Sequence, residues 1–103
     1  MAPAAPTAAY VAVATVVMGI GALGVLLRRS PLAVLMSIEV MWSAANLALV
    51  AYARRWADMS GQILAFVAVT VAAAEVAIGL ALVVLIFRPR SRVDVDDVRE
   101  LRG

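Results

Sequence analysis

The sequence predicts an all-α integral membrane protein in which three transmembrane helices pack as antiparallel neighbours. Hydrophobic residues occupy 65% of the 103 positions, whereas soluble domains are about 45–50% apolar. Charged residues and prolines divide the chain into three long apolar runs. The runs do not alternate apolar and polar residues as the strands of a membrane β-barrel do. Helices are therefore expected, because a helix satisfies its own backbone hydrogen bonds in lipid.

The first apolar run covers residues 7–27 and contains no charged side chain. About 20 helical residues cross the hydrocarbon core of a bilayer, so this run suffices for one span. Arg28 and Arg29 follow its last residue. No basic segment precedes the run, as one would in a cleaved signal peptide. The first helix is therefore expected to remain as a membrane anchor.

Residues 19–24 read GIGALG and match the glycine pattern of dinucleotide-binding loops. Glu39 even lies 20 residues beyond Gly19, where such a site has an acid. That function requires a strand before the glycines and a helix opening after them. Here the glycines lie inside an apolar run, so they are instead expected to let a neighbouring helix approach closely.

The second apolar run covers residues 31–53 and contains one charged residue, Glu39. Ser30 and Pro31 suit the N-cap and the first position of a helix. The third run covers residues 61–87 and again contains one charged residue, Glu75. Asp58 or Ser60 is expected to cap this helix, and Arg88 and Pro89 follow it. The tail, 88–103, has mixed charge and is expected to be a solvated end or a strap on a neighbouring subunit.

The arginines predict the orientation in the membrane. Seven of the nine arginines belong to the first loop and the tail, and two to the second loop. Because cytoplasmic segments carry the excess of positive charge, the first loop and the tail are expected in the cytoplasm and the N-terminus outside. The short loops favour antiparallel neighbours. Three aromatic residues near the ends of the spans suit the membrane interface: Tyr10, Tyr52 and Trp56.

The composition also excludes several classes of function. The chain has no cysteine and no histidine. This excludes disulfides, thiolate chemistry and iron–sulfur ligation, and it disfavours zinc and haem sites. The arginines lie in loops and the tail rather than along one stripe, so nucleic-acid binding is not expected. We expect no metal, no cofactor and no catalytic residue in this chain.

Glu39 and Glu75 are the candidate functional residues because each lies deep in an apolar span. Helix geometry places Glu39 about 12 Å from Pro31 and Glu75 about 18 Å from Phe87. If the two helices are neighbours, the carboxylates lie on the order of 10 Å apart, a gap that two or three waters bridge. An acid at this depth costs about 2.5–3.5 kcal/mol and usually has a function, often in a proton relay.

The residues around the glutamates add detail. Ser43 and Asn46 share the helix face of Glu39 and are expected to support it with polar groups. Near Glu75 runs a stripe of small residues that suits close helix contact, so Glu75 is expected to face protein rather than lipid: Gly61, Ala65, Ala68, Ala72 and Gly79. Since no span contains a basic residue, the counter-charge of an ionised glutamate must come from another polypeptide. The alternative is that both glutamates stay protonated and join helices by hydrogen bonds.

Three segments are distinctive in combination: RRSPLAVLMSIEVMWSAANLALVAYAR, GQILAFVAVTVAAAEVAIGLAL and the ending VRELRG. The most specific part is the pattern A-A-E-x-A-x-G-L-A-L around Glu75, with 36 residues between the two glutamates. On these features nearly the full length of the chain resembles subunit K of the bacterial proton-pumping NADH–quinone oxidoreductase, respiratory complex I.

The resemblance implies a wedge-like subunit between the quinone-proximal subunits and the first antiporter-like subunit of the membrane arm. It implies that Glu39 and Glu75 form a proton relay and that Arg28 and Arg29 are the arginines of a cytoplasmic loop. Ser43 departs from the family, in which asparagine is common at this position. FMN, iron–sulfur clusters and quinone are expected in the whole complex but not in this chain. The expected location is the bacterial cytoplasmic (inner) membrane.

The sequence is also compatible with two other functions. The small subunit of a multisubunit cation/proton antiporter shares the plan of three helices. A purely structural membrane wedge would need neither glutamate. A small drug/proton exporter is disfavoured, because such exporters typically have four spans and an acid in the first, and the first run here has none.

Overall fold

The computed structural model describes residues 4–88 and consists of three α-helices. They are α1 (Thr7–Leu27), α2 (Pro31–Arg55) and α3 (Met59–Phe87). Each helix is long and apolar enough to cross a membrane. The all-helical prediction with three candidate spans is therefore confirmed. Beyond Arg88 the tail lies outside the described residues, and the predictions for it stay predictions.

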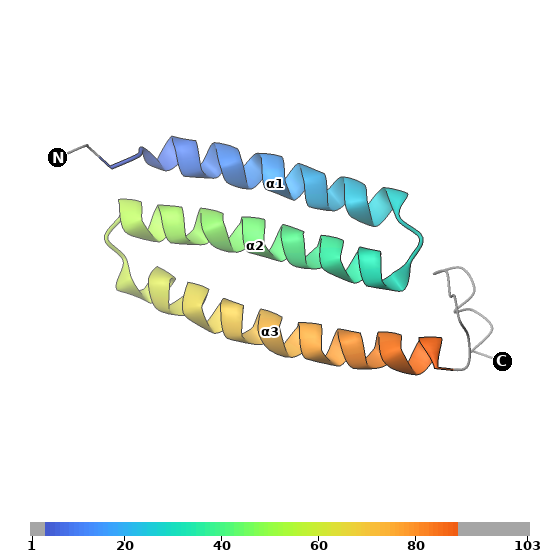
Figure 1. Ribbon diagram of the computed structural model, residues 1–103. Helices are drawn as coiled ribbons and strands as arrows, with labels where there is room; N and C mark the ends of the chain where they lie inside the picture. Colours follow the sequence, from blue (N-terminus) through green and yellow to red (C-terminus); the bar gives the residue numbers. More distant parts are fainter. Residues whose placement is uncertain (1–3, 89–103) are drawn as a thin grey trace.

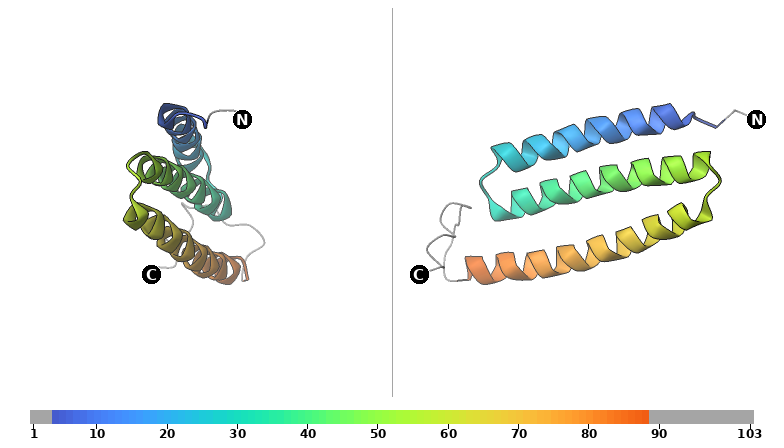
Figure 2. Two further views of the ribbon diagram at one scale, coloured as in Figure 1. Left: turned by 90° about the vertical axis from the view of Figure 1, so that its left-hand side faces the viewer. Right: turned by 180° about the vertical axis from the view of Figure 1, so that it is seen from behind.

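The helices form a single layer with α2 in the middle. Figure 1 shows the chain reversing direction at each loop, so that α1 and α3 begin at the end of the layer where α2 finishes. The end-on view in Figure 2 shows the same row of three. Such a layer has two broad faces. A polar side chain therefore lies either on one of these faces or at a contact between two helices.

The helix bounds follow the apolar runs closely, with two differences. α1 has the predicted bounds, whereas α2 continues two residues beyond the predicted span, to Arg55. Arginines suit a helix C-terminus because they complement the helix dipole. α3 begins two residues early, at Met59, because the side chain of Asp58 caps it by accepting a hydrogen bond from the Ser60 N–H at 2.9 Å.

The loop between α2 and α3 contains an alanine in the left-handed conformation. Ala57 has a φ of 50°. Its N–H donates to the carbonyl of Arg54 at 3.1 Å, and the next N–H, of Asp58, donates to the carbonyl of Ala53 at 2.8 Å. These two bonds form a Schellman motif, which terminates α2. Glycine is the usual residue at this position, because a Cβ disfavours the left-handed conformation.

Small residues form the contacts between helices. Among the described residues the buried positions are all alanine or glycine: Ala14, Gly21, Ala44, Ala51, Ala53 and Ala65. Large apolar side chains lie on the outside instead, and Leu26 and Phe66 are 79% and 74% exposed. This distribution suits a chain surrounded by lipid or by other membrane subunits, where close helix contact replaces a hydrophobic core.

The contact between α1 and α2, here called the α1–α2 seam, depends on Gly21 and Gly24. A Cβ on Gly21 would lie 2.5 Å from Cγ of Met41 and 3.0 Å from the carbonyl oxygen of Ser37. A Cβ on Gly24 would collide with the Ser37 side chain, whereas a Cβ on Gly19 would meet nothing within 4 Å. The expectation of close packing is confirmed for Gly21 and Gly24, whereas Gly19 takes no part in the α1–α2 seam.

The side chain of Arg54, near the end of α2, contacts the start of α1 and the residues just before it. Nη2 of Arg54 donates to the carbonyl of Ala5 at 2.6 Å, and its guanidinium lies 4.9 Å from the ring centre of Tyr10. The rings of Tyr52 and Trp56 stack nearby, with their centres 5.5 Å apart. The three aromatic residues thus gather at one end of the layer, the placement expected of side chains at a membrane interface.

The contact between α2 and α3, here called the α2–α3 seam, uses the predicted stripe of small residues. A Cβ on Gly61 would lie 2.7 Å from Cβ of Ala53, and one on Gly79 would lie 2.8 Å from a terminal methyl of Leu35. Between these points, Nε1 of Trp42 donates to the carbonyl of Ala68 at 3.1 Å. The expectation that this stripe makes a close helix contact is confirmed.

Candidate functional site

The two glutamates lie at the same level of the α2–α3 seam. Ala53 meets Gly61 at one end of the seam and Leu35 meets Gly79 at the other. Eighteen residues separate the two contacts on either helix, so the helices advance in step. Glu39 is four residues from Leu35 and Glu75 is four residues from Gly79, which places the glutamates opposite each other.

This register also explains the unequal depths estimated from the sequence. Continuing it to the start of α2 places Pro31 opposite residue 83, so α3 extends four residues farther. At about 1.5 Å per residue, that overhang accounts for the difference between about 12 Å and about 18 Å. The glutamates are therefore level with each other although their distances from the helix ends differ.

The glutamates lie on opposite sides of the seam. Glu39 lies between Leu35 and Trp42, one turn from each, and Glu75 lies in the same way between Ala72 and Gly79. At about 100° per residue, each glutamate is rotated by about 50° from the residues that touch the other helix. Viewed from one end, the two rotations have the same sense. Since the helices face each other, equal rotations bring the two carboxyls to opposite faces of the layer.

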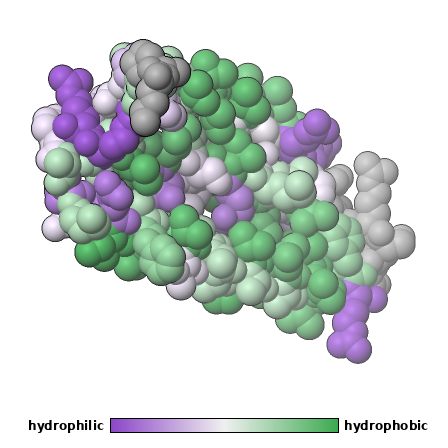
Figure 3. Space-filling model, turned by 60° about the vertical axis from the view of Figure 1, so that its left-hand side comes forward, coloured by the Kyte–Doolittle hydropathy of each residue, from purple (hydrophilic) through white to green (hydrophobic). Residues whose placement is uncertain are grey.

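Glu39 is half-buried, whereas Glu75 is exposed. The expectation that Glu75 faces protein is therefore not met within this chain, because α2 covers the small-residue stripe but not the carboxyl at its edge. Figure 3 shows one largely hydrophobic side of the protein, with hydrophilic residues mainly toward its two ends and a few between them. A carboxyl exposed to lipid at this depth would be unfavourable.

The supporting residues Ser43 and Asn46 lie on the side of α2 that carries Glu39, but neither bonds to its carboxyl. Oγ of Ser43 donates to the main-chain carbonyl of Glu39 at 2.9 Å. Oδ1 of Asn46 is buried and receives no hydrogen bond from the described residues. A buried amide oxygen without a donor costs about 1–3 kcal/mol. Asn46 therefore offers a strong acceptor two turns from Glu39.

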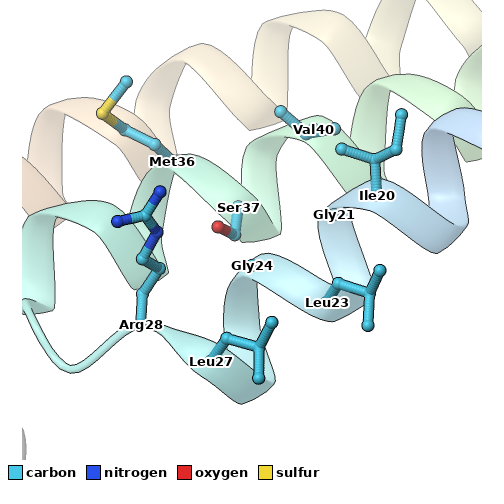
Figure 4. A pocket seen from close by; sticks show the side chains of 9 residues that line it. All are labelled: Ile20, Gly21, Leu23, Gly24, Leu27, Arg28, Met36, Ser37 and Val40. Atoms are coloured by element: carbon cyan, nitrogen blue, oxygen red, sulfur yellow. The ribbon is translucent and has the colours of Figure 1, made fainter.

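Arg28 and Arg29 lie in the loop between α1 and α2, away from the glutamates. The Arg28 N–H donates to the carbonyl of Gly24 at 3.0 Å and ends α1. Its side chain borders a groove of about 350 Å³ between α1 and α2, beside Met36 and Ser37. Figure 4 shows the Arg28 guanidinium near these two residues. Its position at a helix end is consistent with the predicted loop.

Two further residues border the site and were missed in the sequence. Trp42 crosses the seam one turn beyond Glu39, and Leu35 fills the space beside Gly79 one turn before it. A tryptophan in the middle of a span, rather than at its end, is the one signal that marks Trp42. Leu35 has no such signal, because it is one of many leucines in the apolar runs.

Glu39 and Glu75 are the ionisable side chains at this level of the α2–α3 seam. The described residues contain no group of three or more side chains suited to holding a metal ion. A carboxyl is a side chain that can take up or release a proton.

Comparison with known proteins identifies the family. The family model described as NADH-ubiquinone/plastoquinone oxidoreductase chain 4L matches residues 9–103. NADH-quinone oxidoreductase subunit K 1 of Symbiobacterium thermophilum is 59% identical over 100 residues, which cover 97% of this chain and 98% of the relative. NADH-quinone oxidoreductase subunit K of Deinococcus radiodurans is 50% identical and that of Roseiflexus castenholzii 47%, each over 98 residues that cover 95% of this chain and 95% and 98% of the relative, respectively.

Proposed function

The chain belongs to the NADH-ubiquinone/plastoquinone oxidoreductase chain 4L family, and from this premise we propose that it helps couple electron transfer from NADH to quinone with proton translocation. The observation that carries the proposal is the level placement of Glu39 and Glu75 on neighbouring helices. Each is the one charged residue inside an apolar run. Two carboxyls at one depth suit a relay, whereas helix joining within this chain would require a hydrogen bond between them.

In this function each glutamate holds one proton at a time. A proton leaves a glutamate when the local field or hydration changes. A proton released by Glu39 travels along waters to the carboxylate of Glu75, which takes up one proton. Asn46 and Ser43 offer acceptors that hold such waters in place on the side of Glu39. No electron passes through this chain.

We also propose the orientation of the chain, its membrane and its partner subunits. The N-terminus lies outside, the first loop and the tail lie in the cytoplasm, and the helices run antiparallel across the bacterial cytoplasmic (inner) membrane. The partners are the quinone-proximal and antiporter-like subunits, which cover the carboxyls. FMN, iron–sulfur clusters and quinone belong to those or other subunits, and this chain holds no cofactor.

The experiment is Glu75→Gln in native membranes, because glutamine keeps the shape of the side chain and cannot release a proton. NADH oxidation and proton uptake by inverted vesicles are followed together and normalised to the amount of assembled complex. General acid–base groups contribute on the order of 10²–10⁴-fold to rates, and we expect at least a tenfold loss of proton uptake.

Two further variants complete this test. Glu75→Asp keeps the carboxyl and should retain part of the proton uptake, whereas Glu39→Gln should fail as Glu75→Gln does. If both glutamine variants pump at the wild-type level with intact assembly, the chain is a structural wedge. If purified membranes containing the chain exchange cations for protons without NADH, the antiporter function is correct instead.

A further inference from the structure

The α2–α3 seam is closed on either side of the level of the glutamates. One turn toward the start of α2, both terminal methyls of Leu35 lie where a side chain at residue 79 would be, 2.8 and 2.9 Å from the position of a Cβ on Gly79. On the other side of that level, the indole of Trp42, one turn from Glu39, reaches α3 two turns from Glu75 and donates to the carbonyl of Ala68 at 3.1 Å. A path between the two carboxyls has to cross the seam between these contacts.

The two closures differ in how they are held. Trp42 is fixed by a hydrogen bond to the main chain of α3. Leu35 is held by packing alone. Its terminal methyls fill the space that the missing side chain of Gly79 leaves on α3, here called the notch at Gly79. A leucine end moves by a rotation about one bond, on a timescale far shorter than that of a helix shift. Leu35 is therefore the more easily displaced of the two closures.

An apolar closure blocks protons by excluding water. Proton transfer over the distance between the glutamates needs a chain of waters, and apolar constrictions in membrane proteins stop conduction by dewetting. With Leu35 in the notch, the seam beside the glutamates presents carbon atoms from both helices. With Leu35 displaced, the notch at Gly79 would have room for water, because glycine has no side chain to refill it.

We propose that Leu35, seated at Gly79, is a positioning residue that keeps Glu39 and Glu75 from exchanging protons until it moves. The inference rests on the proposed relay function. In each transfer the O–H bond of the protonated Glu39 carboxyl breaks, a water chain carries the proton, and an O–H bond forms on the Glu75 carboxylate. Negative charge thereby moves from Glu75 to Glu39, and no other reactant is needed.

The experiment measures protons taken up per NADH oxidised in inverted membrane vesicles, normalised to the assembled complex. Leu35→Ala empties the notch, and the ratio is expected to fall by at least about twofold because protons exchange between the carboxyls out of step with electron transfer. NADH oxidation itself should persist, which separates this effect from general damage. Leu35→Met conserves volume and should keep the wild-type ratio.

Two further variants test whether the filled notch is what matters. Ile38→Ala removes a side chain of the same size at nearly the same level, from a position that is 44% exposed, and it should leave the ratio unchanged. The double variant Leu35→Ala with Gly79→Val has as many side-chain carbons in the notch as the natural pair. It is expected to restore the ratio that Leu35→Ala loses.

The outcomes separate this inference from the proposed function. If Glu75→Gln abolishes proton uptake while Leu35→Ala keeps the wild-type ratio, the relay stands and the role of Leu35 is wrong. If Glu75→Gln pumps normally, both proposals fail. A ratio that the double variant does not restore also overturns the role of Leu35. Should Leu35→Ala prevent assembly, Leu35→Val makes a smaller opening and is read by the same criteria.

Discussion

The two seams of this protein use the same kind of residue for different ends. In the α1–α2 seam the atoms nearest to Gly21 include main-chain atoms of Ser37 and Met41, which cannot move without moving α2. In the α2–α3 seam the atoms nearest to Gly79 are the ends of the Leu35 side chain. The first seam is therefore rigid and the second is deformable at one point.

The glutamates border only the deformable seam. Glu39 and Glu75 each lie within one turn of the Leu35–Gly79 contact, whereas the ionisable side chain beside Gly21 and Gly24 of the α1–α2 seam is Arg28, at the end of α1. The contrast indicates a division of roles within one small layer. α1 and α2 form a closely packed pair, and α3 lies against α2 at the seam that the carboxyls border.

The largest expected effect tests the rigidity of the α1–α2 seam. Gly21→Ala should destabilise the assembled complex by about 1–3 kcal/mol, because its Cβ overpacks against the main chain of α2. The measurement is the temperature at which the purified complex loses its NADH–quinone activity. Gly19→Ala is the matched control in the same helix, since a Cβ there meets nothing within 4 Å. Equal effects of the two variants would contradict the description of this seam.

A substitution in the loop between α2 and α3 is expected to raise the stability of the complex. Ala57→Gly removes the Cβ from a residue with a φ of 50° and should stabilise the turn between α2 and α3 by about 1 kcal/mol. The same thermal measurement shows it as a higher inactivation temperature. Ala73→Gly, in the middle of α3, should act in the opposite direction. A loss of stability in Ala57→Gly would show that this turn does not limit the pairing of α3 with α2.

The smallest effect concerns the hydrogen bond that crosses the deformable seam. Trp42→Phe removes the indole N–H and should destabilise the complex by about 0.6 kcal/mol, the average for hydrogen bonds between membrane helices. The Ala68 carbonyl lies inside α3 and keeps its main-chain hydrogen bond in that helix, so the substitution leaves no buried acceptor without a donor. Comparing inactivation temperatures of the variant and the natural complex measures the loss. A drop as large as that of Gly21→Ala would make Trp42 the main support of the seam.

The sequence predicts the helices of this fold well, because apolar runs and their flanking charges mark membrane spans directly. The bounds of α1 agree to the residue, and α2 and α3 differ only where Arg54, Arg55, Met59 and Ser60 continue a helix past its apolar run. A helix ends where its backbone is capped, which is not where the apolar residues end.

The sequence is less informative about the surroundings of the site. It places Glu39 and Glu75 deep in their spans, but their level alignment depends on which residues of α2 and α3 touch. The exposure of Glu75 depends on how wide an arc α2 covers, which helix periodicity does not contain. For the same reason, GIGALG indicates close packing without indicating that Gly19 takes no part in it.

The contact of Arg54 with the first helix bears on the order of synthesis. The residues that it joins, Ala5 and Tyr10, leave the ribosome long before α3 does, and chains fold from the N-terminus as they are made. Once residue 54 has emerged, α1 and α2 can close as a hairpin. α3 then docks on a surface of α2 that already exists, so the helix with the exposed carboxyl is the last to be added.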